Sequence, residues 1–210
     1  MQGLLALSKI IDKLNTGVGW LMMWMILAST VISCINAIVR KVFDVGSNAF
    51  LEVQWYLFAT SFLLAAGYTL LNNEHVRIDV VSGRFSKRTQ IWMDIVGFVL
   101  FLIPVCVAIL WFSMPFFLNG LRSGEVSANA GGLILWPVYL MLPLGFALLL
   151  VQTISELIKR FAFLKGLIDD PTAKKGEKSA EEELAESIRL IAEAKAEAEA
   201  KVLAQAKANA

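Results

Sequence analysis

The sequence is poor in the residues that most metal, haem and catalytic sites require. Its 210 residues include one histidine, His75, and two cysteines, Cys34 and Cys106, which both lie inside apolar runs. A metal site needs several His, Cys, Asp or Glu side chains that converge, and bis-histidine haem ligation needs two histidines. A Ser-His-Asp triad would have to use His75 itself, and the sequence contains neither a P-loop nor a glycine-rich dinucleotide motif. We therefore expect no cofactor, no metal site and no enzyme activity.

Charge is scarce in four long stretches of the chain. The sequence is 57% hydrophobic and its mean hydropathy is +0.64, which is too apolar for a soluble protein of this size. A helix needs about 20 apolar residues to cross a bilayer, and four segments satisfy this: residues 18–39, 50–71, 91–118 and 133–158. The basic residues do not cluster on a folded soluble face, so we expect no nucleic acid partner. The composition predicts an all-α integral membrane protein with four transmembrane helices.

The few charges inside these segments lie near their ends. Glu52 and Asp94 lie near the starts of the second and third segments, and Glu156 lies near the end of the fourth. We expect water or lipid headgroups to reach all three. Ionisable groups at mid-membrane mark ion and proton pathways, and the sequence places none there. Prolines are expected to interrupt the third and fourth helices, at Pro104, Pro115, Pro137 and Pro143.

The distribution of Lys and Arg over the short loops predicts the orientation, because basic residues favour the cytoplasmic side. Nine lie on one side: Lys9, Lys13, Arg77, Arg84, Lys87, Arg88, Lys159, Arg160 and Lys165. Three lie on the other: Arg40, Lys41 and Arg122. Both termini and the loop of residues 72–90 are therefore expected in the cytoplasm. Within that loop, Arg84, Lys87 and Arg88 are expected to contact lipid headgroups.

The two ends of the chain differ from its membrane segments. Leu4, Leu7, Ile11 and Leu14 repeat at spacings of three and four, which predicts an amphipathic interfacial helix whose stripe suits lipid or a partner subunit equally. Residues 1–168 are expected to form the membrane domain. Residues 169–210 are expected to form a cytoplasmic linker and a soluble Ala/Glu/Lys-rich helix, either solvated alone or forming a weak coiled coil or docking helix.

Two short motifs resemble a known family. The second segment opens with EVQWYLF at residues 52–58, and the loop that follows it contains EHVRID at residues 74–79. Together with the four-span layout, these motifs resemble the small permease subunit of tripartite ATP-independent periplasmic (TRAP) transporters, the DctQ-like family, over about residues 10–160.

The resemblance implies a location and partners. It implies a multi-pass protein of the bacterial inner membrane that is a scaffold for a large multi-span permease subunit. It also implies a periplasmic solute-binding protein as a second partner, and sodium-driven uptake of an organic acid, with the sodium bound by the large subunit. Two alternatives remain open from the residues alone: a stand-alone small channel or exporter, and a membrane anchor of a redox complex.

Two groups of residues are candidate sites. The first group would fix the cytoplasmic turn or contact the large subunit: Glu74, His75, Arg77 and Asp79. The second would form structural pairs on the outer face or dock the binding protein: Arg40, Lys41, Glu52, Arg122 and Glu125. Within this second group, Glu52 is expected to pair with Arg40, with Lys41 or with a partner subunit.

Overall fold

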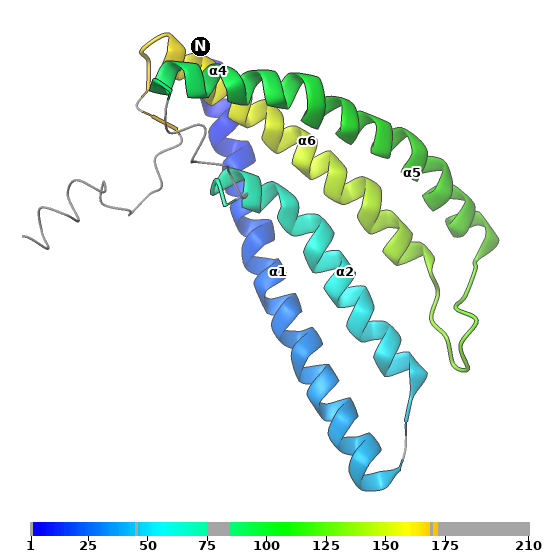
Figure 1. Ribbon diagram of the computed structural model, residues 1–210. Helices are drawn as coiled ribbons and strands as arrows, with labels where there is room; N and C mark the ends of the chain where they lie inside the picture. Colours follow the sequence, from blue (N-terminus) through cyan, green and yellow to red (C-terminus); the bar gives the residue numbers. More distant parts are fainter. Residues whose placement is uncertain (1, 45, 75–84, 169, 172–210) are drawn as a thin grey trace, which may run out of the picture. The chain divides into compact units, whose positions relative to one another are not determined.

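Four long helices account for almost all of the structure. The computed structural model describes residues 2–44, 46–74, 85–168 and 170–171, all within one compact unit, residues 1–172. The helices are α1 (Gln2–Phe43), α2 (Asn48–Leu71), a third that consists of α4 (Lys87–Gly97), η1 (Phe98–Leu102) and α5 (Ile103–Ser123), and α6 (Trp136–Leu164) (Figure 1). Each of the four is long and apolar enough to span a membrane. The predicted all-α fold with four such helices is confirmed.

The first helix runs without a break from Gln2 to Phe43. At 1.5 Å per residue its 42 residues extend over about 63 Å. The amphipathic N-terminal segment is therefore the first part of α1 and not a separate helix. Of its apolar stripe, Ile11 is buried whereas Leu4 and Leu7 are about half exposed, at 48% and 47%.

A π-helical turn interrupts the third helix. The Ile103 N–H donates to the carbonyl of Phe98, five residues earlier, and Pro104 follows directly. A proline has no N–H, and its ring clashes with the carbonyl four residues before it. The wider π turn gives that carbonyl more room, which makes Pro104 the physical reason for the turn.

The other three prolines occupy different positions within their helices. Pro115 and Pro143 lie inside α5 and α6. Pro137 lies in the first turn of α6, where a missing N–H costs no hydrogen bond. The prediction that Pro137 interrupts the fourth helix is therefore wrong, because that helix begins at Trp136.

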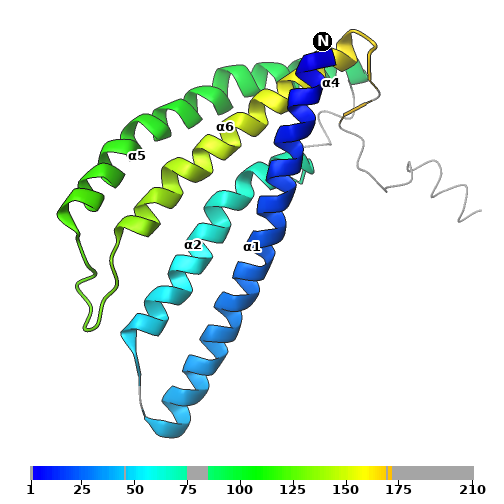
Figure 2. The ribbon, with the colours of Figure 1, turned by 180° about the vertical axis from the view of Figure 1, so that it is seen from behind.

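Helix α6 is the centre of the packing. It contacts α1, α2, α4 and α5, while α1 packs mainly on α2. Helices α1 and α5 lie on opposite sides of the α2–α6 pair (Figures 1 and 2). A glycine permits a close approach of α2 and α6, since a Cβ at Gly145 would lie 2.6 Å from the carbonyl oxygen of Leu63.

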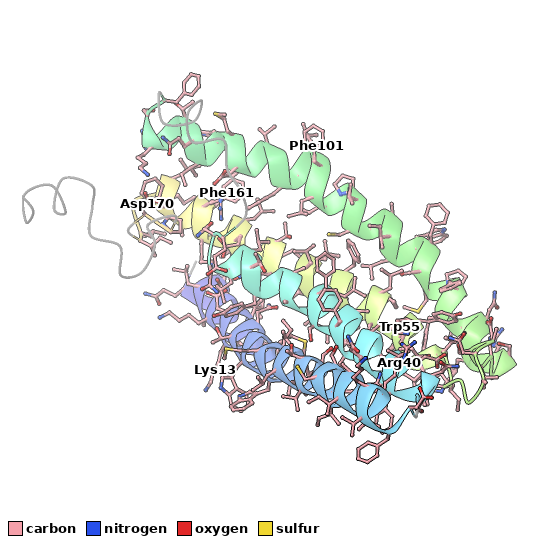
Figure 3. All side chains as sticks on the ribbon, turned by 60° about the horizontal axis from the view of Figure 1, so that its bottom comes forward. Lys13, Arg40, Trp55, Phe101, Phe161 and Asp170 are labelled. Carbon is pink, nitrogen blue, oxygen red and sulfur yellow. The ribbon has the colours of Figure 1, made fainter. Side chains whose placement is uncertain are left out.

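The interior of the described part of the chain is more polar than its surface. Nine hydrophobic residues are buried there, against eleven polar or charged ones. The most exposed large hydrophobic side chains are aromatic, and they include Phe112 (77%), Trp111 (76%) and Phe101 (70%), which projects outward in Figure 3. This arrangement is typical of membrane helices, which associate through small and polar residues while apolar residues face lipid.

Candidate functional site

The second half of α6 carries a row of buried polar side chains. Gln152, Ser155 and Arg160 have no exposed surface, and Glu156 is 1% exposed. Residues three and four positions apart lie on one helix face, so these side chains form a continuous polar surface inside an apolar protein. The prediction that water or headgroups reach Glu156 is therefore wrong, and it is wrong for Glu52 as well, which is also 1% exposed.

Asp12 connects this surface to α1. Its carboxylate accepts hydrogen bonds from Gln152 Nε2 at 3.0 Å and Ser155 Oγ at 2.9 Å. Lys159 Nζ lies 3.2 Å from Asp12 Oδ2 and also forms an ion pair with Glu156. The N-terminal part of α1 is thus fastened to α6 by charge as well as by packing.

Two further hydrogen bonds extend the contact between the same two helices. Asn15 Nδ2 donates to Gln152 Oε1 at 2.8 Å. The hydroxyls of Ser8 and Ser155 lie 2.7 Å apart. The polar residues of α1 recur at spacings of three and four, which places them on one face toward α6.

Arg160 connects α6 to the third membrane helix. Its Nε donates to Asp94 Oδ2 at 3.1 Å, and its Nη1 donates to Glu156 Oε2 at 2.5 Å. The guanidinium carbon lies 4.5 Å from the centre of the Phe98 ring, in a cation–π contact. A cation removed from water needs compensation of this kind, because desolvation otherwise outweighs the Coulombic gain.

We call Asp12, Asp94, Glu156, Lys159 and Arg160 the charge network. It joins α1, α4 and α6, and its members are held by one another. No group of three or more His, Cys, Asp or Glu side chains among the residues described could hold a metal ion. Because its carboxylates and cations pair with one another across three helices, the charge network is a structural clamp.

A second clamp lies near the start of α2. Glu52 is 1% exposed, and its two carboxylate oxygens accept from Asn129 Nδ2 at 2.8 Å and from the Leu133 N–H at 2.7 Å. The connection between α5 and α6 forms a small hairpin there, in which the Ser127 N–H donates to the Leu133 carbonyl at 2.9 Å. Glu52 thus fastens this hairpin to α2.

The scan against family models identifies the chain. Residues 29–163 match the model described as "Tripartite ATP-independent periplasmic transporters, DctQ component". The chain belongs to the DctQ family. It is a small membrane subunit of a TRAP transporter and not an enzyme. Neither a curated protein nor a solved structure matches it.

All five outer-face candidates of this DctQ-family chain lie within the described residues. Glu52 has a structural pairing, but its partners are on the hairpin; in the described residues it forms no ion pair with Arg40 or Lys41. Those two cations lie in the last turn of α1 and are exposed (Figure 3, Arg40). Arg122, in the last turn of α5, and Glu125, in the hairpin, are exposed as well.

The predicted cytoplasmic residues of the DctQ-family chain are described only at the edges of their loop. Glu74 follows α2, and its N–H donates to the Thr69 carbonyl at 3.1 Å. Lys87 forms an ion pair with Asp170 at 3.4 Å, and Arg88 Nη2 donates to the Leu164 carbonyl at 3.4 Å. The remaining candidates lie outside the described residues: His75, Arg77, Asp79 and Arg84.

Sequence reasoning missed most of the charge network. It read Lys159 and Arg160 only as loop charges that orient the chain, and it did not consider Asp12 as a site residue. The sequence nevertheless contains a pattern that indicates a polar face on this helix. Polar residues recur there at helical spacing beside an apolar run: Gln152, Ser155, Glu156 and Lys159.

Proposed function

We propose that this DctQ-family chain is the rigid, non-catalytic wall of a sodium-driven organic acid importer. In this role it scaffolds the large multi-span permease subunit and helps to dock the periplasmic binding protein, while sodium and the transported acid bind to the partners. The observation that carries the proposal is the charge network. Its carboxylates and cations, of which Glu156 and Arg160 are buried, are engaged with one another across three helices, which suits a fixed support.

Reconstitution tests this role directly. The full chain, the large subunit and the binding protein are incorporated in proteoliposomes, and uptake of radiolabelled carboxylic acids is measured with an inward sodium gradient. We expect uptake only when all three proteins are present. Sodium-dependent uptake by this chain alone would overturn the proposal.

We further propose that both termini face the cytoplasm of a bacterial cell and that the chain lies in the inner membrane. The nine-to-three distribution of basic residues supports this orientation. At about 63 Å, α1 is longer than a hydrocarbon core of about 30 Å, so in this orientation its N-terminal part would lie at the cytoplasmic interface with the charge network. A C-terminal green fluorescent protein fusion should fluoresce, whereas an active C-terminal alkaline phosphatase fusion would contradict the orientation.

The EHVRID motif is proposed to fix the cytoplasmic turn and contact the large subunit. The support is its alternating charge pattern and its place in the family resemblance. Arg77→Ala and Asp79→Ala should each reduce co-purification of the large subunit several-fold, while Lys13→Ala, on an exposed part of α1 (Figure 3), serves as the control. Unchanged yields for both motif variants would count against this role.

We propose that exposed charges on the outer face dock the binding protein and that Glu52 positions the hairpin. Arg40, Lys41, Arg122 and Glu125 are all exposed, and exposed charges affect the rate of association more than the affinity. Surface plasmon resonance with the binding protein should therefore show a slower association rate for a Arg40→Ala, Lys41→Ala double variant. An unchanged rate at low salt would remove these two cations from the docking surface.

A further inference from the structure

Helix α6 ends in a turn that changes the direction of the chain. The Leu167 N–H donates to the Ala162 carbonyl at 3.0 Å, and the Gly166 N–H donates to the Phe163 carbonyl at 2.8 Å. These two bonds form a Schellman motif, and the φ of its glycine is +71°, in the left-handed region that favours this residue. The segment that follows α6 therefore starts in a defined direction.

This segment contacts the ends of two other helices. Asp170 Oδ2 lies 3.4 Å from Lys87 Nζ, at the start of α4. The carbonyl of the next residue, Pro171, accepts a hydrogen bond at 3.4 Å from Asn73 Nδ2, two residues after the end of α2. Two consecutive residues thus contact both ends of the connection between α2 and α4. We call residues 165–171 the C-terminal strap, of which residues 165–168, 170 and 171 are described.

A third contact joins the start of α4 to the end of α6 itself. Arg88 Nη2 donates to the carbonyl of Leu164, the last residue of α6, at 3.4 Å. Carbonyls of the last helical turn have no acceptor role within their own helix, and the helix dipole favours a cation beside them. The consecutive cations Lys87 and Arg88 therefore hold the start of α4 to the C-terminal strap and to the helix that precedes it.

The C-terminal strap is held less firmly than the charge network. The side chains of Lys87 and Asp170 are 65% and 24% exposed, whereas those of Arg160 and Glu156 are 0% and 1% exposed. An ion pair that water reaches is screened by salt and contributes little to stability. The hydrogen bonds of 3.4 Å are also longer than most hydrogen bonds in proteins. Opening the strap therefore costs less than opening the buried network.

We propose that the C-terminal strap is a releasable link that sets the spacing between the end of α2 and the start of α4. Both helices pack on α6, so α6 positions their bodies while the strap positions the ends that border their connection. That connection carries the EHVRID motif, and opening the strap would alter how the motif meets the large subunit. This consequence rests on the proposed function, whereas the spacing is a property of the chain alone.

Dipolar electron paramagnetic resonance on the full chain in nanodiscs, without other subunits, measures this spacing. Spin labels are attached at Glu74→Cys and Thr89→Cys in a chain whose two native cysteines are replaced by alanine. We expect Asp170→Lys to broaden the distance distribution at least about twofold, because two cations then repel each other. Glu125→Lys is the matched control, since it is the same charge reversal at an exposed residue of the hairpin between α5 and α6.

Two further variants separate the ion pair from the backbone turn. Lys87→Glu combined with Asp170→Lys restores opposite charges and should recover at least about half of the lost order. Gly166→Ala should also broaden the distribution, because a side chain is strained at its positive φ. Gly46→Ala is its control, since an added Cβ at either glycine meets no atom within 4 Å.

Three results would overturn the proposal: equal distributions for Asp170→Lys and Glu125→Lys, no recovery in the charge swap, or an unchanged distribution for Gly166→Ala. Each of them would leave the scaffold role untouched, because no other subunit is present in the measurement.

Discussion

At the scale of single residues, Arg160 determines the character of the charge network. Its side chain has no exposed surface, yet it contacts the carboxylates of Asp94 and Glu156 and the face of Phe98. A planar guanidinium can serve two acceptors and an aromatic face at once, which an ammonium cannot do equally well. Arginine at this position therefore links α4 and α6 in a way that lysine would reproduce only in part.

Removing this cation should be costly. Arg160→Met leaves two carboxylates without their shared partner, and breaking a buried pair in this way typically costs about 3–5 kcal/mol. We expect a correspondingly lower unfolding free energy in mild detergent, measured by denaturant titration. Arg122→Met, on an exposed turn of α5, should change it by less than about 0.5 kcal/mol. Equal effects of the two substitutions would contradict the structural role of Arg160.

Glu52, near the start of α2, is a second residue whose side chain holds distant parts of the chain together. It accepts the Leu133 N–H at 2.7 Å, and hydrogen bonds to charged groups contribute about 1.5–3 kcal/mol. Glu52→Ala should therefore increase amide hydrogen exchange at Leu133 at least about tenfold. Glu125→Ala, an exposed residue of the same hairpin, should leave that rate unchanged; a similar increase in both variants would show that Glu52 has no special hold on the hairpin.

At the scale of elements, the N-terminal part of α1 is a structural component of the fold. Asp12 brings it to α6 through Lys159, Gln152 and Ser155. An amphipathic segment that only rested on lipid would have no such directional contacts. Its orientation along α6 is therefore set within the chain itself.

Asp12 and Lys13 are neighbouring charges on α1, and substituting each of them tests the contact between α1 and α6. Asp12→Leu removes the carboxylate that Lys159 contacts, whereas Lys13→Leu alters an exposed neighbour (Figure 3). We expect Asp12→Leu to accelerate protease cleavage within residues 2–17 and Lys13→Leu to leave it unchanged, because local opening follows the loss of buried contacts. Equal cleavage rates would indicate that packing alone holds this segment.

The sequence was sufficient to predict the four membrane-length helices but not the contacts between them. Four apolar runs of membrane-spanning length specify four helices whatever their neighbours are. The partners of Glu52, in contrast, lie 77 and 81 residues further along the chain, and no local pattern links them. Lys159 and Arg160 follow an apolar run in the way that ordinary loop charges do, so their burial depends on how α1, α4 and α6 meet in space.

At the scale of the whole molecule, the compact unit ends at residue 172, close to the predicted end of the membrane domain. The division into residues 1–168 and 169–210 stays a prediction that truncation can test. A chain that ends after residue 172 keeps the Lys87–Asp170 ion pair, and we expect it to retain its melting temperature within about 2 °C and its transport in the reconstituted system. A complete loss of transport would show that the tail is a required partner site.

The polar interior of the four helices affects which amino-acid substitutions this chain can accept during evolution. Thr153 and Ser155 are fully enclosed, whereas Trp111 and Phe112 are more than three-quarters uncovered. A substitution table derived from water-soluble domains would treat the hydroxyls as replaceable and the aromatic rings as fixed. Where these side chains face lipid, the family should follow the opposite rule, so that bulky apolar side chains interchange while the buried small hydroxyls persist.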